Sequence, residues 1–404
     1  MQTSLTEVFR ATPEGQEAER ILRTCVHCGF CTATCPTYQL LGDELDGPRG
    51  RIYLMKRVLE GHPATRITQE HLDRCLTCRA CETACPSEVQ YSRLLDIGRS
   101  VVEERVERPL GERVARYLLR RVVPYPRRFA QVLRLARWLR PLLPHRLRGV
   151  VTPKEAAVGA WPCGKHERKM LLFDGCVQPV LAPAINMAAA RVLDRLGIES
   201  VRVQKAGCCG AISHHLTATE EAKQFMRRNI DAWWPYVQQG IEAIVITASG
   251  CAPLVKDYAD LLRQDPNYAA KANAVSKLAK DIAEVVSIED VSRLAPADWV
   301  PQRVAFHSPC TLVHAQGLHG RVGSLLRDLK IPLVPVDDAH SCCGSAGTYS
   351  LLQPALSMRL LDRKIKALEA HQPQLIATAN IGCYAHLRQG ASVPVRHWIE
   401  MLDG

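Results

Sequence analysis

Short apolar runs of strand length alternate with helix-like segments along residues 169–404. Met170–Phe173 and Ala243–Ala248 are two such runs, and Pro183–Leu196 between them carries apolar residues at helical spacing and ends at Gly197. Strands separated by helices favour parallel pairing, because a parallel connection needs a long crossover. The pattern therefore predicts parallel α/β structure, Rossmann-like in kind, for this part of the chain.

The same part of the chain repeats itself at an offset of about 134 residues. Gly207–Gly210 reads Gly-Cys-Cys-Gly, and Ser341–Gly344 reads Ser-Cys-Cys-Gly. The first copy carries Cys176, Cys208, Cys209 and Cys251, and the second carries Cys310, Cys342, Cys343 and Cys383. We predict a first half over residues 169–300 and a second half over residues 301–404. Because ligands bind at the carboxyl ends of parallel strands, the cysteines should converge in one cleft per half.

Residues 1–100 are organised around two cysteine runs. A polar helix over Thr3–Leu22 is expected before the first run, and a connecting helix over Arg51–Glu60 before the second. The first cysteine run is Cys25–Pro36 and the second is Cys75–Pro86, and both read C-x2-C-x2-C-x3-C-P. Small cores of this kind are held by their metal, so folding and metal binding should be coupled.

Three thiolates at two-residue gaps can bend around one face of a cubane cluster, while the fourth cysteine, followed by proline, ligates the other cluster. Two copies of the motif therefore predict two crossed [4Fe-4S] clusters. Cluster 1 is expected on Cys25, Cys28, Cys31 and Cys85, and cluster 2 on Cys35, Cys75, Cys78 and Cys81.

Zinc and structural disulfides are the alternatives for these cysteines. A zinc site needs only four ligands and leaves no use for a third close cysteine followed by a Cys-Pro pair. Disulfides call for an oxidising compartment, yet Met1–Arg20 has no apolar core of a signal peptide. We therefore expect a chain that stays in the cytoplasm with reduced, cluster-binding cysteines.

The 404 residues carry 52 basic and 41 acidic side chains, a net charge of +11. Much of the excess lies between Arg99 and Arg148, where arginines alternate with apolar residues and several prolines interrupt them. Such amphipathic helices could lie on a membrane, dock on an acidic partner or pack across a domain junction. No apolar stretch is long enough to span a bilayer. Without a zinc finger or RNA-recognition motif, no nucleic-acid partner is expected.

These observations divide the chain into four parts: the cluster domain (1–100), the arginine-rich helices with a linker over Val151–Lys169 (101–168), and the two halves. The expected fold class is α+β and multi-domain, with a helical ferredoxin-like domain before the two α/β halves. Cys163, in the linker, belongs to neither motif and is expected to be a bystander.

The repeated vicinal cysteines favour ligation or redox chemistry over core packing, because two adjacent side chains cannot point the same way in regular structure. Soft thiolates would select an iron-sulfur centre. His307, His340 and His386 lie close by in sequence, and His386, in Cys383-Tyr-Ala-His386, is the one of greatest interest. A lone histidine is more often structural than a ligand.

With both motifs in place, the chain resembles the family of iron-sulfur subunits of bacterial glycolate oxidases, within the Cys-Cys-Gly superfamily. The likeness covers essentially the whole length. It is most specific in Cys25–Tyr53, Glu70–Cys81, Asn229–Pro235 and Cys342–Tyr349.

The resemblance implies the electron-transfer subunit of a complex that oxidises glycolate to glyoxylate. FAD-linked partner subunits would reduce its two [4Fe-4S] clusters, and a membrane acceptor, for which quinone is expected, would take the electrons. The chain would then be peripherally associated with the cytoplasmic face of the inner membrane and would not be catalytic alone. No G-x-G-x-x-G follows a strand and no P-loop occurs, so no flavin is expected on this chain.

Two alternatives stay open. The chain could be the iron-sulfur subunit of a related lactate or glycerol-3-phosphate dehydrogenase, or a catalytic subunit like that of heterodisulfide reductase. The latter family resembles this chain but has a terminal C-x2-C, whereas Leu254 and His386 replace its second cysteine here. Four cysteines remain in each half, so a heterodisulfide-type cluster is not expected, but a further conventional iron-sulfur centre is left open.

Overall fold

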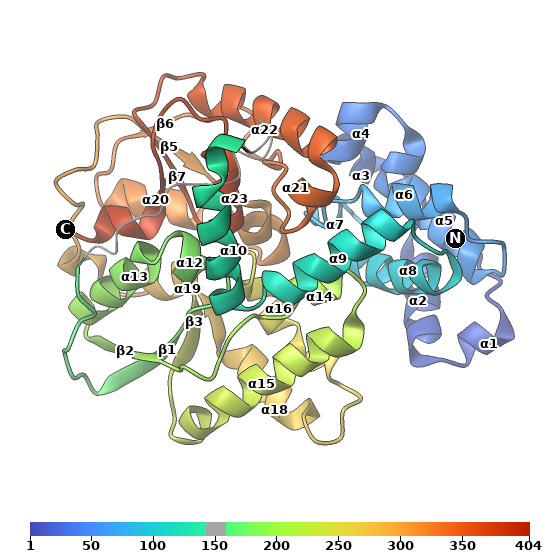
Figure 1. Cartoon of the computed structure of the whole chain (residues 1–404), viewed down its shortest axis with the longest axis horizontal. Coiled ribbons are helices and arrows are strands. Elements are labelled where there is room, and N and C mark those ends of the chain that lie inside the picture. The colour runs from blue at the N-terminus through green and yellow to red at the C-terminus, as the bar shows by residue number, and fades with distance from the viewer. Residues whose placement is uncertain (143–158) are drawn as a thin grey trace.

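Two four-stranded parallel sheets form the centres of the two halves (Figure 1). The computed structural model describes residues 1–142 and 159–404. The first sheet has the order β2-β1-β3-β4 and the second has the equivalent order β6-β5-β7-β8. The strands are β1 (Arg168–Phe173), β2 (Ile198–Arg202), β3 (Ala243–Ile246), β4 (Ala279–Asp281), β5 (Val304–His307), β6 (Leu333–Val334), β7 (Leu375–Thr378) and β8 (Val395–His397). The predicted parallel α/β repeat is confirmed.

Helices flank both sheets and bury the strands between them on both faces, as in β3 and β7. In the first half they are α12 (Gln178–Leu181), α13 (Ala184–Arg195), α14 (Ala211–His215), α15 (Thr219–Gln238), α16 (Ala252–Lys256), α17 (Tyr258–Leu261), α18 (Ala269–Leu278), α19 (Ile282–Val286) and the 3-10 turn η3 (Val291–Arg293). In the second half they are the π-helical turn η4 (Thr311–Ala315), α20 (Arg321–Asp328), α21 (Tyr349–Leu352), α22 (Pro354–Glu369), α23 (Ile381–Leu387) and the 3-10 turn η5 (Trp398–Leu402).

A single core runs between the two halves. Residues of α13 in the first half pack against η5 at the C-terminal end of the chain. His397, at the end of β8, reaches back to the first half, where its Nε2 lies 3.0 Å from the carbonyl oxygen of Thr247. The two halves are therefore joined by a shared hydrophobic core and not by a linker alone.

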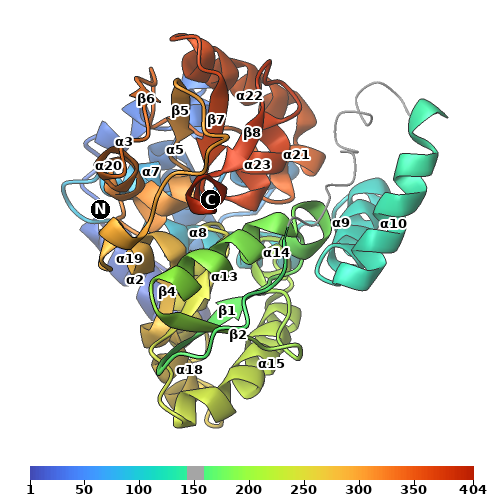
Figure 2. The same ribbon diagram turned by 90° about the vertical axis from the view of Figure 1, so that its left-hand side faces the viewer.

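The N-terminal domain is helical, as expected (Figure 2). Its elements are α1 (Glu7–Arg10), α2 (Pro13–Thr24), α3 (Phe30–Ala33), α4 (Pro36–Leu41), η1 (Glu44–Asp46), α5 (Pro48–Leu59), α6 (Arg66–Asp73), α7 (Ala80–Thr83) and α8 (Tyr91–Arg105). The core forms where α2 and α5 pack on α8. Gly98 permits this packing, because a Cβ there would lie 2.5 Å from the sulfur of Met55.

The first predicted helix, Thr3–Leu22, is broken in the structure. Pro13 begins a new helix at the N1 position, where its missing N–H costs nothing. The Thr12 side chain caps that helix by accepting a hydrogen bond from the backbone N–H of Gly15, 3.0 Å away. The connecting helix was placed correctly and begins slightly earlier, at Pro48.

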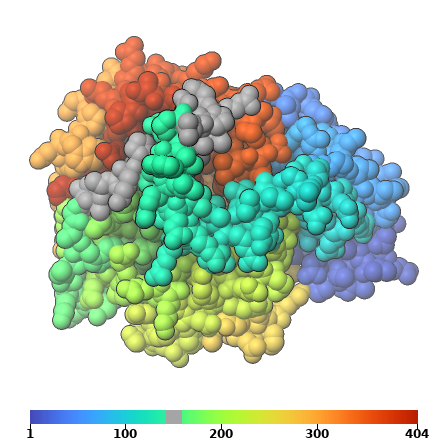
Figure 3. Space-filling view, viewed as in Figure 1, coloured from blue at the N-terminus to red at the C-terminus, as the bar shows by residue number. Residues whose placement is uncertain are grey.

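The arginine-rich segment forms α9 (Leu110–Val122), α10 (Pro126–Trp138) and the turn η2 (Arg140–Leu142), which lie across one face of the molecule (Figure 3). The expected linker falls partly on residues 143–158, which lie outside the described residues. The inner side of α9 joins two domains, since Arg116 pairs with Asp73 of α6 at 3.0 Å and Arg120 with Glu221 of α15 at 3.4 Å. The predicted packing across a junction is thus seen on this side.

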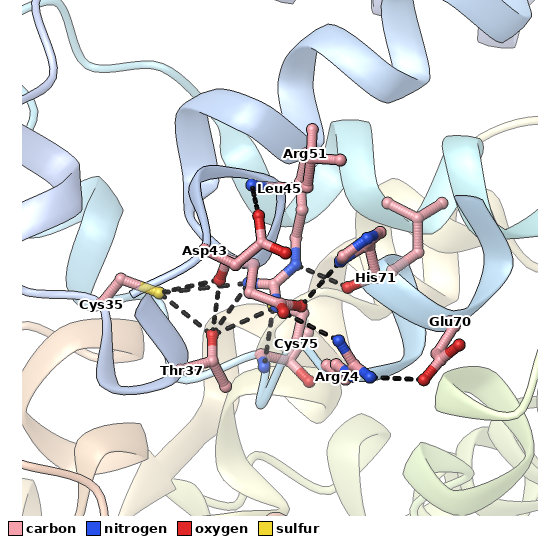
Figure 4. Close-up of polar contacts among 12 residues, drawn as sticks. Cys35, Thr37, Asp43, Leu45, Arg51, Glu70, His71, Arg74 and Cys75 are labelled. Carbon is pink, nitrogen blue, oxygen red and sulfur yellow. Dashed lines mark hydrogen bonds and ion pairs between the residues drawn. The ribbon is translucent and has the colours of Figure 1, made fainter. Parts of the chain in front are cut away.

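Arg51 ties the two cysteine runs together from within the N-terminal domain (Figure 4). Its side chain is 1% exposed and its Nε donates to the carbonyl oxygen of His71 at 2.7 Å. The guanidinium also donates to Thr37 Oγ1 at 3.1 Å and pairs with Asp46 at 3.4 Å. Asp46 in turn contacts His71 and Arg74 at 3.0 and 2.9 Å. This buried network connects the turn after the first run with the helix before the second.

Arg51→Met should destabilise the N-terminal domain by about 3 to 5 kcal/mol, because buried Asp46 loses one of its two arginine partners and the buried acceptors of Thr37 and His71 lose a charged donor. The matched control is Arg49→Met on the same helix. Arg49 pairs with Glu44 at 2.6 Å but is 38% exposed, so its loss should cost no more than about 1 kcal/mol. Anaerobic denaturant unfolding of the cluster-loaded chain measures both. Equal effects of the two substitutions contradict the assigned role of the Arg51 network.

Candidate iron-sulfur sites

The two cysteine runs adopt the same unusual backbone. His27 and Gly29 in the first run, and Thr77 and Arg79 in the second, all have positive φ, between 53° and 87°. Three of these four are not glycine, and the left-handed conformation is costly for them. Each run is thereby coiled so that its first three cysteines face a common centre.

The structure places the predicted crossed sets around two separate cavities. One cavity is lined by Cys25, Cys28, Cys31 and Cys85, with Cys81 at its border. The other is lined by Cys35, Cys75, Cys78 and Cys81. Proline follows the fourth cysteine of each run. In the first run Pro36 begins α4, so Cys35 stands at the start of a new helix and points away from the other three cysteines of its run. The fourth cysteine of each run therefore lies with the first three of the other.

Burial and crowding act strongly on these thiols. Burial, with the charges of the Cys25 and Cys85 thiolates, raises the pKa of Cys31 to about 11. Burial and the charges of the neighbouring Cys310 and Cys35 raise the pKa of Cys78. Burial and the charges of Cys78 and Cys75 raise the pKa of Cys81. Several thiolates at such short range need positive charge at the centre of each cavity, which iron supplies.

Two buried donors near these cavities fit the same group. His27 Nε2 and Tyr349 Oη are buried and have no hydrogen-bond partner among the described residues. His27 lines the first cavity. Burial, with the charges of the Cys75 and Cys342 thiolates, raises the pKa of Tyr349, so Tyr349 lies beside the second cavity. The sulfides of a bound cluster accept hydrogen bonds of this kind, so the donor set and the orphaned groups both fit [4Fe-4S] clusters.

Arg51 lies beneath the second cavity, with Nη1 4.0 Å from the sulfur of Cys35 (Figure 4). Burial tends to lower the pKa of this guanidinium, but the thiolates of Cys75 and Cys35 and the carboxylate of Asp46 raise it above its usual value. The second cavity therefore has a permanent, fully buried cation at its edge. The sequence alone did not single out Arg51, because its partners come from four separate segments.

The cysteines of each half also meet. In the first half the side chains of Cys176, Cys208, Cys209 and Cys251 form a continuous series of thiol contacts. In the second half Cys310, Cys342, Cys343 and Cys383 form the equivalent series. Three of the four are buried in each half, so they converge beneath the surface and not in an open cleft.

Among the histidines, His307 and not His386 faces the cysteines. A ring nitrogen of His307 and the sulfurs of Cys343 and Cys383 all lie within 4.8 Å of one another. Both ring nitrogens of His386 have other contacts, with Ser357 Oγ at 3.0 Å and Gln389 Nε2 at 3.3 Å. A comparison of the two repeats could have identified His307. The equivalent position of the first half holds the apolar residue Phe173, so the histidine is a difference between the two halves.

His340 and Cys163 lie apart from these sites. The His340 side chain is 55% exposed and pairs with Asp338 at 3.3 Å. Cys163 is exposed, and its thiol lies 3.8 Å from the carbonyl oxygen of Trp161.

Burial, with the charge of Lys364, holds the pKa of His307 well below its usual range. Its imidazole is therefore neutral at neutral pH, which is the form that can bind a metal. Nδ1 lies 2.9 Å from Thr378 Oγ1, and this contact orients the ring.

Comparison with known proteins identifies two kinds of domain in this chain. Residues 21–89 match the 4Fe-4S dicluster domain, and residues 170–255 and 304–388 each match the cysteine-rich domain that carries the Cys-Cys-Gly motif. The chain therefore carries iron-sulfur clusters.

Three relatives illustrate the likeness. The glycolate oxidase iron-sulfur subunit of Escherichia coli K12 is 53% identical over 403 residues, which is 100% of this chain and 98% of the relative. The probable glycolate oxidase iron-sulfur subunit of Bacillus subtilis 168 is 31% identical, over 91% of this chain and 89% of that protein. Lactate utilization protein A of an Exiguobacterium species is 26% identical and matches 57% of this chain and 96% of its own length. The chain belongs to the family of glycolate oxidase iron-sulfur subunits.

Proposed function

We propose that this chain relays electrons, one at a time, from the flavin of a partner subunit to a membrane acceptor during oxidation of glycolate to glyoxylate. That oxidation releases two electrons, which the clusters carry singly when bound. The observation that carries the proposal is the pair of adjacent cavities, each lined by three cysteines of one run and the fourth of the other. Cys81 borders both cavities, so the two centres are close neighbours.

We assign the ligands accordingly. Cys25, Cys28, Cys31 and Cys85 hold cluster 1, and Cys35, Cys75, Cys78 and Cys81 hold cluster 2. Cys28 is exposed, whereas Cys35 and Cys81 are buried. Cluster 1 is therefore the more accessible one and is suited to take electrons from a partner's flavin, while cluster 2 lies deeper, against the second half.

Glycolate as the substrate of the whole complex follows from the likeness to the two glycolate oxidase subunits. The cysteine sites supply thiolates for electron transfer and no group placed to take a hydride from a 2-hydroxy acid. The chain thus depends on FAD-linked partner subunits for the chemical step.

The outer side of α9 and α10 supports attachment to a membrane surface. Apolar side chains are exposed there beside basic ones, including Leu118 (53% exposed), Leu135 (57%) and Trp138 (77%). The arginines exposed on the same two helices and the turn after them are Arg113, Arg121, Arg127, Arg128, Arg134 and Arg140. Exposed apolar residues mixed with arginines favour binding to the interface of an anionic bilayer. Among the described residues, no helix has the length and apolar character needed to cross one.

The crossed ligation is tested by pairing alanine variants. Cys85→Ala should remove the same electron paramagnetic resonance (EPR) signal as Cys28→Ala, and Cys35→Ala the same signal as Cys78→Ala, each with loss of the roughly four iron atoms of one cluster. Cys163→Ala is the control and should keep all the iron. If Cys85→Ala instead removes the signal lost in Cys78→Ala, the crossing is wrong.

The relay is tested in the complete complex with its flavoprotein partners. Cys28→Ala should abolish glycolate-dependent reduction of a quinone, while reduction of a dye that accepts electrons directly from flavin continues, because cluster 1 lies between the flavin and the acceptor. Wild-type rates of quinone reduction in this variant contradict the relay. Loss of both activities, with the complex intact, points instead to a catalytic role for the chain.

Membrane attachment is tested by sedimentation with vesicles. The chain should bind anionic vesicles more tightly than neutral ones, and binding should weaken with salt. Leu135→Glu should weaken binding roughly tenfold, since full burial of a leucine side chain contributes about 1.5 to 3 kcal/mol. Ile288→Glu, at a 74% exposed residue of the first half, is the control and should have no effect. Equal losses in the two variants would show that α10 is not the membrane-binding surface.

A further inference from the structure

We propose that the second half, through Cys310, Cys342, Cys343 and Cys383 with His307 as a fifth donor, holds a third iron-sulfur centre that exchanges electrons directly with cluster 2. The inference rests on the ligand assignment of cluster 2 proposed above. In each transfer cluster 2 is oxidised by one electron and the third centre is reduced by one electron. No bond is made or broken and no proton is transferred.

The first argument is the donor set. Cys343, Cys383 and His307 offer a nitrogen and two sulfurs within 4.8 Å of one another, and all three residues are buried. The thiols of Cys342 and Cys310 continue the same series of contacts. Four thiolates and an imidazole at one buried point are donors that select iron-sulfur centres or zinc.

The second argument is a buried charge. Lys364 of α22 is 0% exposed, and among the described residues its ammonium group donates to the backbone carbonyl oxygens of Asp338 and Ala339, at 3.2 and 3.0 Å. The nearby carboxylate of Asp338 pairs with Arg363 and His340. A buried ammonium needs a negative counter-charge.

The cysteines can supply this counter-charge. Lys364 lies within electrostatic reach of Cys342, Cys343 and Cys383. The Asp338 carboxylate, which also acts on Lys364, is already paired with Arg363 and His340, so an anionic, thiolate-ligated centre would supply the further negative charge that four neutral thiols cannot.

The third argument is the contact with cluster 2. Cys78 and Leu76 of the second cysteine run pack in one apolar cluster with Cys310, Cys342 and Tyr349 of the second half. The thiols of Cys78 and Cys310 lie within electrostatic reach of each other. A ligand of cluster 2 and a ligand of the third centre are therefore neighbours.

Hydrogen bonds between the domains hold this contact in place. Arg359 and Arg363 of α22 donate to the carbonyl oxygen of Leu40 and the side chain of Gln39, at 3.0 and 2.8 Å. Both acceptors belong to α4, the helix that begins directly after Cys35.

The first half lacks these features at equivalent positions. Phe173 replaces His307 and packs edge-on against Trp233, with ring centroids 5.4 Å apart. Asn229 of α15 replaces Lys364 and donates to the carbonyl oxygen of Cys208 at 2.8 Å.

The cysteines of the first half also have different neighbours. Cys176 and Cys208 pack against Phe225 and near Tyr125 of the arginine-rich segment, and the Arg228 guanidinium lies 5.0 Å from the centre of the Phe225 ring. The first half therefore provides a matched control built into the same chain.

The test compares Cys343→Ala with Cys209→Ala in the full chain, purified and reconstituted anaerobically. The wild-type chain should hold more than the eight iron atoms of two cubane clusters, and Cys343→Ala should lose about four iron atoms and one EPR signal. Cys209→Ala should keep that signal. In the wild type the signal should be broadened by spin coupling to cluster 2.

Four results would overturn the inference: eight iron atoms in the wild type, loss of the same signal in both variants, zinc in place of iron at the Cys343-dependent site, or no spin coupling to cluster 2. Failure of the crossed ligation of cluster 2 is detected separately, by the Cys35 and Cys78 variants.

Two milder substitutions keep the test valid if Cys343→Ala does not fold. Lys364→Met should shift the midpoint potential of the third centre to a more negative value, because a cation that favours the reduced state is removed, and should leave cluster 1 unchanged. His307→Phe, which installs the residue of the first half, should change the EPR signal of the third centre only. An unchanged potential in the first variant together with an unchanged signal in the second would contradict the proposal.

Discussion

The exchange of the fourth cysteine between the two cysteine runs is the constraint on which the rest of the structure depends. Because Cys35 and Cys85 each lie with the other run, neither cavity can form unless both runs are in place. The exchange brings the two centres together, with Cys81 at the border of both. It also fixes α4, which follows Cys35 and carries the surface on which α22 of the second half docks.

Buried charge is the second theme. Thiolates and the clusters they hold are anionic, and the structure places a fully buried cation beside two of the sites, Arg51 under the second cavity and Lys364 under the cysteines of the second half. Arg51 also pairs with Asp46, and each of the two cations stabilises an anionic occupant of the site beside it. Both are also placed to set potentials, since nearby positive charge favours the reduced form of a cluster.

Much of this could be predicted from the sequence, because the information is local. The spacing of the two cysteine runs, the repeat of Cys208-Cys209 as Cys342-Cys343, and the alternation of strands and helices each lie within short segments. The polar pattern continues through both of the first two helices and so predicts one helix, although Thr12 and Pro13 mark the break between them.

What could not be predicted is long-range. Arg51, Lys364 and the contact of Cys78 with Cys310 depend on which segments meet in three dimensions. The sequence favours His386 over His307 because His386 is close to Cys383 along the chain, but that distance is a poor guide to orientation within the fold.

The central claim is that these centres lie on the electron path and do not merely hold the fold together. The most direct measurement is freeze-quench EPR of the complete complex mixed anaerobically with glycolate in the absence of an acceptor. Signals of the reduced clusters should then appear within the time of a single turnover, with two electrons distributed over the flavin and the iron-sulfur centres for each glycolate oxidised. Full reduction of the flavin while every cluster stays oxidised would contradict the account.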